Sequence, residues 1–205
     1  FVLPIHNISL DVVNNEFTHR AVAQLDLHQS INTAVRCVMQ YNGAPIGSPS
    51  FRAKIYLQAN KLALTQWAKE LHFKKWLQPL KVSGGLANIS VWATWKNKQL
   101  SRVQTVTHMT HVSVRNSTLT PIDTIKQLDL NAVWQSTSRG WYLKANKLKL
   151  LDAGYDYTPN AVMVNYQKPT HGDAGRIDAS IGVLSIPLIK HMLLGYGHFP
   201  VAWRH

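Results

Sequence analysis

The chain has 205 residues, 45% of them hydrophobic and 16% charged, which is enough to bury a core in one large β domain or in two joined halves. Its 22 Lys and Arg outnumber its 10 Asp and Glu, and the formal charge of +12 suits an anionic partner such as nucleic acid or a phospholipid surface. No run of about 18 apolar residues is present, so no helix is predicted to span a membrane. The sequence begins at Phe1 without a secretory signal, which indicates a piece of a longer protein.

Alternating apolar and polar residues at the start of the chain predict three strands, at residues 8–12, 23–27 and 35–41. Asn14-Asn15 predicts the turn between the first two. Residues 43–49, which contain Pro and Gly, predict a loop after the third.

The most regular alternation lies in residues 51–59, which predict a strand with one apolar and one polar face. A short helix is predicted at 66–71, and Gly84-Gly85 predicts a turn. A second alternating strand follows at 87–95, and 103–114 is its expected partner.

Beyond a loop at 116–123, strands are predicted at 128–134, from 142 onward and at 162–166, with a connection at 168–175 and a second short helix at 187–194. These elements predict a mainly β fold, a curved antiparallel sheet of about ten short strands with two short helices. The chain is expected to form a single segment, 1–205, with internal repeat units of about 1–82 and 83–205.

A nine-residue motif occurs twice, as YLQANKLAL at residues 56–64 and as YLKANKLKL at residues 142–150, with seven identical positions. Each copy reads as a strand, a polar break at Asn-Lys and a short apolar continuation. A looser third copy occupies residues 177–186. Such self-similarity is typical of a supersecondary unit that packs beside its own copy.

The sequence offers little for catalysis. The few acidic residues are dispersed, and Cys37 stands alone as an expected small buried hydrophobe. His108 and His111 would point to opposite faces of a strand, which serves a shared metal poorly. No enzyme activity, metal or cofactor is therefore expected.

Seven Trp and seven Tyr can stack on bases, but no aromatic and basic signature of a single-strand-binding sheet is present.

A large sheet with few helices to cover it can curl so that its apolar face lines a trough. Four strands spaced about 4.8 Å apart span roughly 19 Å, more than the roughly 15 Å depth of one leaflet's hydrocarbon. A trough of this size can shelter an acyl chain, whereas the alternative is an ordinary sandwich with a closed core.

Residues 85–100 (GLANISVWATWKNKQL) resemble the G-x-L-x-x-I-x-L-W-x-x-W…L strand pair of the YhdP family, AsmA-like envelope proteins of Gram-negative bacteria. Residues 140–148 (GWYLKANKL) resemble the family's G-W-x-L-x-A-x-x-L strand, and residues 55–71 and 177–194 are similar to its strand-plus-helix pieces. The similarity covers most of residues 50–200. The strongly basic charge and the frequent His and Asn depart from the family's pattern and leave the lipid preference open.

The resemblance implies a periplasmic segment of a protein anchored in the inner membrane, with an elongated, taco-like β groove that carries phospholipid toward the outer membrane. It implies no catalytic residue. The expected partner is phospholipid, with membrane association through segments outside this chain, envelope proteins as further partners and no nucleic acid.

The leading hypothesis is thus a lipid-binding β groove. The candidate lipid-binding residues are Phe51, Ala53, Ile55, Leu57, Ile89, Val91, Ala93, Leu128, Leu130, Val162, Val164, Ile177, Ala179 and Ile181. Lys54, Lys144 and Lys147 are candidates for contacts with headgroups at a rim. The alternatives are a structural or adaptor β domain that binds a protein through an exposed sheet edge, and a basic nucleic-acid-binding module.

Overall fold

The structure is a computed structural model that describes residues 5–27, 33–65, 80–116, 124–152, 155–169 and 174–182. All ten elements in this part of the chain are strands. They are β1 (Ile5–Asn14), β2 (Thr18–Leu27), β3 (Thr33–Asn42), β4 (Arg52–Ala63), β5 (Leu80–Lys96), β6 (Gln99–Asn116), β7 (Thr124–Thr137), β8 (Gly140–Asp152), β9 (Tyr155–Gln167) and β10 (Arg176–Ile181).

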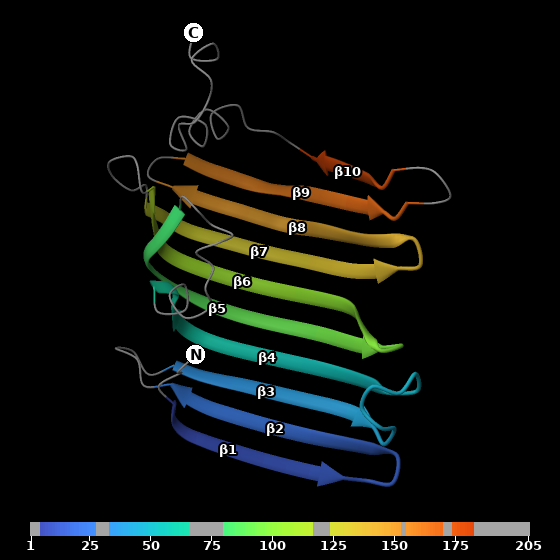
Figure 1. Cartoon of the computed structure of the whole chain (residues 1–205). Helices are drawn as coiled ribbons and strands as arrows, with labels where there is room; N and C mark the ends of the chain where they lie inside the picture. The colour runs from blue at the N-terminus through green and yellow to red at the C-terminus, as the bar shows by residue number, and fades with distance from the viewer. Residues whose placement is uncertain are drawn as a thin grey trace.

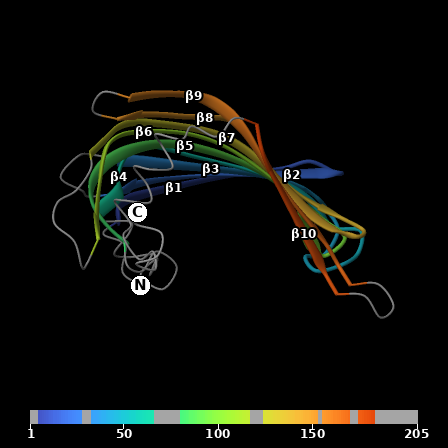
Figure 2. The same cartoon turned by 90° about the horizontal axis from the view of Figure 1, so that it is seen from above.

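The strands form one antiparallel sheet in which each strand pairs with its neighbours in sequence, in the order β1 to β10 (Figure 1). Seen from above, the sheet is bent rather than flat (Figure 2). The predicted mainly β, antiparallel, curved architecture is therefore confirmed. The two predicted helices, at 66–71 and 187–194, lie outside the described residues.

Tight turns join the strands where the sequence supplies turn residues. Asn97 and Lys98 have φ values of 53° and 61° between the paired residues Lys96 and Gln99. Positive φ at both central positions is the geometry of a two-residue hairpin turn whose twist matches the strands. The loop after β3 is fastened by the Asn42 side chain, which accepts from the Arg52 amide (2.8 Å) and donates to the Ser50 carbonyl (2.8 Å).

The repeated Asn-Lys break is a β-bulge in both copies of the motif. The pairing of β4 with β5 shifts between Ala59 and Leu62, and the pairing of β8 with both neighbours shifts around Asn146. At the first bulge Lys61 has a φ of 53°, and its amide donates to the Asn88 side chain (2.8 Å). The strands therefore continue through the motif, and a bulge adds local bend and twist to each.

The predicted turn at Gly84-Gly85 is wrong, because both glycines lie inside β5. The pairing with β6 shifts on either side of Gly84, and Gly85 has a φ of 121°. A Cβ on Gly85 would lie 3.0 Å from the Val112 Cα, so glycine permits both the conformation and the close approach. The expected short strands are correspondingly longer here, with 17 residues in β5 and 18 in β6. The expected boundary between units, near 82 and 83, falls within β5.

The buried core lies on one face near the middle of the sheet. Val35, Ala59, Leu62 and Ala87 form its centre, at relative exposures of 7% or less. Thr33 is buried beside the bulge, where its hydroxyl donates to the Lys61 carbonyl (3.0 Å). Within the described residues, no helix has the length and apolar character needed to cross a bilayer.

Candidate functional site: an apolar groove

The register of the sheet separates its side chains into two faces of opposite character. Residues paired across antiparallel strands point to the same side, so one row can be followed through the whole sheet. One such row is Val12, Ala21, Met39, Ile55, Ala93, Val103, Trp134, Leu143, Val164 and Ala179. Every member of this row is apolar. We call the side that carries it the apolar face, and the opposite side the outer face.

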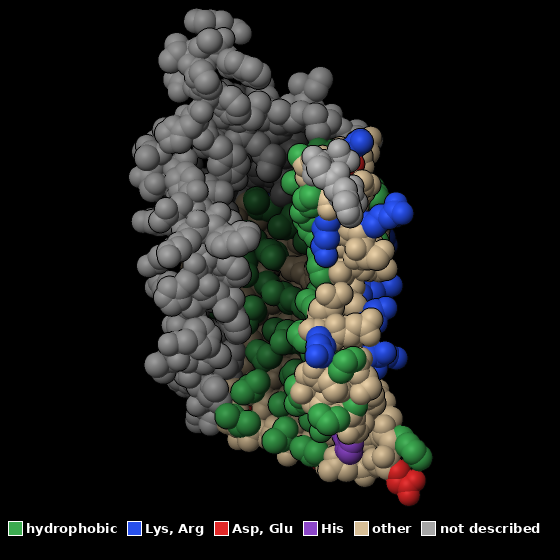
Figure 3. All heavy atoms as spheres, turned by 45° about the vertical axis from the view of Figure 1, so that its right-hand side comes forward, with side chains coloured by type: hydrophobic (Ala, Val, Ile, Leu, Met, Phe, Trp, Pro, Cys, Tyr) green, Lys and Arg blue, Asp and Glu red, His purple; other side chains and the backbone are tan. Residues whose placement is uncertain are grey.

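The apolar face lines the hollow of the curved sheet. Figure 3 shows hydrophobic side chains gathered in the recessed surface, with Lys and Arg side chains along the outside. This arrangement follows from the alternation in each strand, because a sheet that curls toward its apolar side removes that side from water.

All fourteen candidate lipid-binding residues lie on the apolar face, thirteen of them by register and Phe51 by its alternation with Ala53 and Ile55. The structure also sorts them by exposure. Phe51 and Ala53 are buried at 5% and 4%, and Leu57 and Ile89 pack against the core cluster. The residues at the β10 end are open instead, with Ile177 at 68% and Ile181 at 50%.

The three candidates for headgroup contacts do not lie in the apolar row; they are Lys54, Lys144 and Lys147. Lys54 pairs with Thr94 and Lys144 pairs with Val133, which places both on the outer face. Lys147 belongs to the bulge of β8 and pairs with Asn131. All three are exposed. Of the three, only Lys54 lies close to a strand end, and their contact with headgroups stays a prediction.

Several groove residues were missed at the sequence level, although their alternation was visible. On β1, Ile8, Leu10 and Val12 face the groove and are 59%, 67% and 49% exposed. Trp134 and Leu143 extend the central row on β7 and β8. Alternation shows that a strand has two faces. The register across strands is needed to say which of the two alternating sets of side chains lies on the common face.

Two hydroxyl groups interrupt the apolar face on β6. Thr105 pairs with Val91 and Ala132, and Thr107 pairs with Ile89 and Leu130. Their side-chain oxygens lie 3.3 Å apart, so each hydroxyl has a hydrogen-bonding partner within the sheet. These two hydroxyl groups on the floor of the groove therefore have a hydrogen-bonding partner without water.

Aromatic rings collect along one margin of the apolar face, at the edge where the β3–β4, β5–β6 and β7–β8 connections lie. We call this margin the hairpin edge. Tyr41 lies 6.0 Å from Phe51 and 5.0 Å from His19, measured between ring centroids, and Trp141 lies 5.8 Å from Tyr166. Tyr and Trp rings with one apolar and one polar end are typical of boundaries between hydrocarbon and water.

The outer face carries one notable carboxylate. Asp129 accepts from Gln127 (2.6 Å) and lies 2.5 Å from His108 Nδ1. Burial raises the pKa of Asp129, but the hydrogen bonds from His108 and Gln127 and the charges of His108 and Lys149 outweigh it and hold that pKa below its usual value. In the part of the chain that the structure describes, no three His, Cys, Asp or Glu side chains are grouped so that they could hold a metal.

A family model described as YhdP protein matches residues 1–194, which include all ten strands. This chain belongs to the YhdP family. The resemblance found in residues 85–100 and 140–148 is thereby confirmed. The open curved sheet with one apolar face agrees with the β groove that membership in the YhdP family implies. No match is found among curated proteins or among solved structures.

Proposed function

We propose that this YhdP-family chain binds phospholipid by sheltering the acyl chains on its apolar face. The observation that supports this most strongly is the unbroken apolar row from Val12 on β1 to Ala179 on β10. A soluble sheet of this size usually covers such a face with helices or a second sheet. Here the two ends of the row are open, at 49% exposure for Val12 and with Ala179 also exposed.

The dimensions of the groove suit a lipid chain. Ten strands at about 4.8 Å spacing extend over roughly 43 Å, which exceeds the roughly 30 Å hydrocarbon thickness of a bilayer. Burial of an acyl chain yields about 0.8 kcal/mol for each CH₂ group. Because the row from Val12 to Ala179 is apolar on every strand and the Thr105 and Thr107 hydroxyls are paired with each other, a chain meets no large barrier as it moves from one strand to the next.

In this proposal the domain is a passive conduit within a periplasmic portion of an inner-membrane-anchored protein. The hydrophobic effect holds the acyl chain on the apolar face, and this requires no reacting group. Segments outside this chain would provide the membrane anchor. Phospholipid is then passed between the inner and outer membranes along the groove.

A matched pair of charged variants tests the proposal. Ile55→Lys places an ammonium group in the middle of the apolar row, whereas Gln58→Lys adds the same charge to the outer face of the same strand. Native mass spectrometry of the full chain should find phospholipid bound to the wild type and to Gln58→Lys. Ile55→Lys should lose most of it, because an unpaired charge is costly to place in an apolar site.

Circular dichroism and thermal melting of both variants separate lipid loss from unfolding. The proposal is contradicted if the wild-type protein carries no phospholipid, or if folded Ile55→Lys retains as much lipid as Gln58→Lys does.

A further inference from the structure

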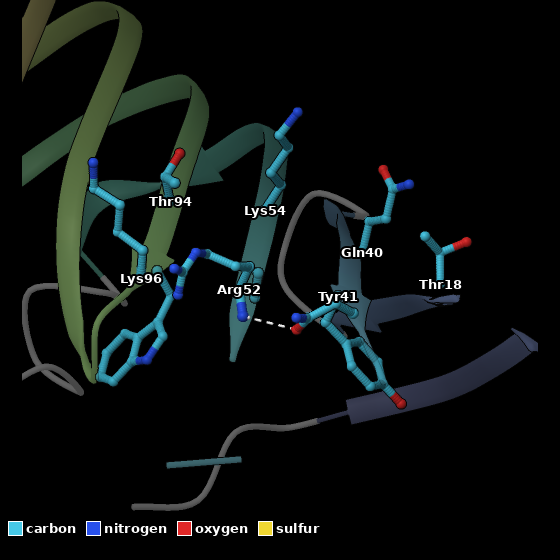
Figure 4. Close-up of a pocket in the computed structure, with 10 residues that line it drawn as sticks. Thr18, Gln40, Tyr41, Arg52, Lys54, Thr94 and Lys96 are labelled. Carbon is cyan, nitrogen blue, oxygen red and sulfur yellow. Dashed lines mark hydrogen bonds between the residues drawn. The ribbon is translucent and has the colours of Figure 1, made fainter. Parts of the chain in front are cut away.

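A second recess lies at the hairpin edge. It has a volume of about 250 Å³ and is formed by β2, β3, β4 and β5. Thr18, Gln40, Arg52, Lys54, Thr94 and Lys96 line it from the outer face, and Tyr41, Ala53 and Trp95, which belong to the apolar face by register, also line it. Figure 4 shows Thr18, Gln40, Lys54, Thr94 and Lys96 projecting to one side of the sheet, whereas Tyr41 projects to the other.

The charges around this recess are all of one sign. Arg52 and Lys96 are directly opposite each other on β4 and β5, and Lys54 lies two residues farther along β4 on the same face. Like charges in opposed positions destabilise a sheet. Among the residues that the structure describes, none of the three is in an ion pair with a carboxylate, so this repulsion is uncompensated within that part of the chain.

Arg52 is held in place by its surroundings. One terminal nitrogen, Nη1, donates to the Pro49 carbonyl (2.8 Å) and approaches the Phe51 carbonyl (3.3 Å). The Arg52 amide is fixed by the Asn42 side chain (2.8 Å), which also fastens the loop between β3 and β4. The other guanidinium nitrogens keep N–H groups for a ligand, and a donor that is already positioned loses less entropy when it binds.

We propose that this recess binds a phosphate group, carried by a lipid headgroup or by a free phosphate. An arginine fork and two lysine ammonium groups are the side chains that recognise phosphate oxygens most strongly. The Thr94 hydroxyl lies between Lys54 and Arg102 in the register and can donate to the same anion. A volume of about 250 Å³ is slightly below the range of about 300–1,000 Å³ for pockets that enclose drug-sized molecules, so the recess suits a small group.

This inference rests on the charges of Arg52, Lys54 and Lys96 and not on the apolar row, so it does not depend on the groove holding an acyl chain. Binding of an anion would relieve the repulsion between Arg52 and Lys96. It would also place a phosphate beside the aromatic margin that contains Tyr41.

The test compares Arg52→Gln/Lys96→Gln with Arg36→Gln/Lys126→Gln in the full chain. Both double variants remove two positive charges, but Arg36 and Lys126 are exposed residues outside the recess. Inorganic phosphate is titrated by calorimetry, and vesicles of phosphatidylglycerol in phosphatidylcholine are tested by co-sedimentation against phosphatidylcholine alone. The recess variant should weaken binding at least about tenfold, because hydrogen bonds to charged groups contribute strongly, and the control variant should weaken it far less.

A loss confined to the vesicles assigns the phosphate to a lipid headgroup, and a loss confined to inorganic phosphate assigns it to a free anion. Arg52→Lys/Lys96→Arg keeps both charges but loses the positioned fork of Arg52, so it should bind more weakly than the wild type and more strongly than Arg52→Gln/Lys96→Gln. Circular dichroism of all the variants detects a folding defect. The proposal fails if neither probe binds, or if the recess and control variants weaken binding equally. If the recess does not bind phosphate, the difference in bound lipid predicted between Ile55→Lys and Gln58→Lys still holds. The two proposals are therefore tested separately.

Discussion

The size of individual side chains shapes the floor of the groove. Its most buried positions include three alanines, Ala53, Ala59 and Ala87, at 4%, 3% and 1% exposure, beside Leu62 at 4%. Larger groove residues such as Leu10 and Ile177 stand open at the ends, at 67% and 68%. These alanines are covered by the protein's own atoms, so the apolar surface that a guest chain can reach lies at the more exposed positions of the face.

On the outer face, the carboxylate of Asp129 makes the free energy of unfolding depend on pH. The pKa of Asp129 is lower in the folded chain than its ordinary value of 3.8, so its contribution to stability is present above about pH 4 and is lost as the pH falls through the folded value. Asp129→Asn should therefore be less stable than the wild type at neutral pH. The difference in the free energy of unfolding should close on acidification.

Urea unfolding of both proteins at a series of values between about pH 7 and about pH 2 measures this difference. The groups that face Asp129, which are His108, Gln127 and Lys149, are unchanged in the variant. A stability difference that stays constant across the series would show that the charge of Asp129 contributes nothing.

At the scale of the element, the bulge is the feature that separates these strands from plain ones. The Asn-Lys motif interrupts the pairing of β4 with β5 and of β8 with its neighbours, and a bulge increases the local bend. Because the same motif occurs in two strands of one sheet, its repetition supplies curvature at two places along the groove.

The bulge in β4 depends on the Asn88 side chain, which accepts from the Lys61 amide at 2.8 Å. Asn88→Ala removes this acceptor and should lower the free energy of unfolding by about 1 kcal/mol. Asn88→Asp keeps an oxygen in the same place and should cost less. Chemical denaturation of the three proteins measures both effects, and equal losses in the two variants would assign the loss to something other than the hydrogen bond.

The sequence predicted strands well where alternation was clear, and less well where the backbone departs from it. Residues 51–59 alternate without interruption, and their apolar set lies on the common face as expected. The Asn60-Lys61 bulge was interpreted as a break, because polar residues after an apolar run look like a strand end. The prediction of a turn at Gly84-Gly85 was wrong for a different reason, because glycine is common both in turns and in bulges.

At the scale of the whole molecule, the groove arises from the register of ten strands. Each strand contributes only a few apolar side chains, and the face becomes continuous because the rows align from β1 to β10. The identity of the face was predictable from alternation, but its burial was not, because exposure depends on what each residue packs against. The recess at the hairpin edge was also beyond the sequence, since it joins residues from β2, β3, β4 and β5.

The most direct test of the central claim is a scan with a photo-crosslinking amino acid placed at each position from 53 to 58 in turn, in the full-length protein in the presence of phospholipid. Neighbouring residues of β4 point to opposite faces, so the scan compares groove and outer face within one strand. Lipid adducts are expected at 55 and 57, fewer at the buried position 53, and few at 54, 56 and 58. Adducts spread evenly over all six positions, or absent from all of them, would contradict it.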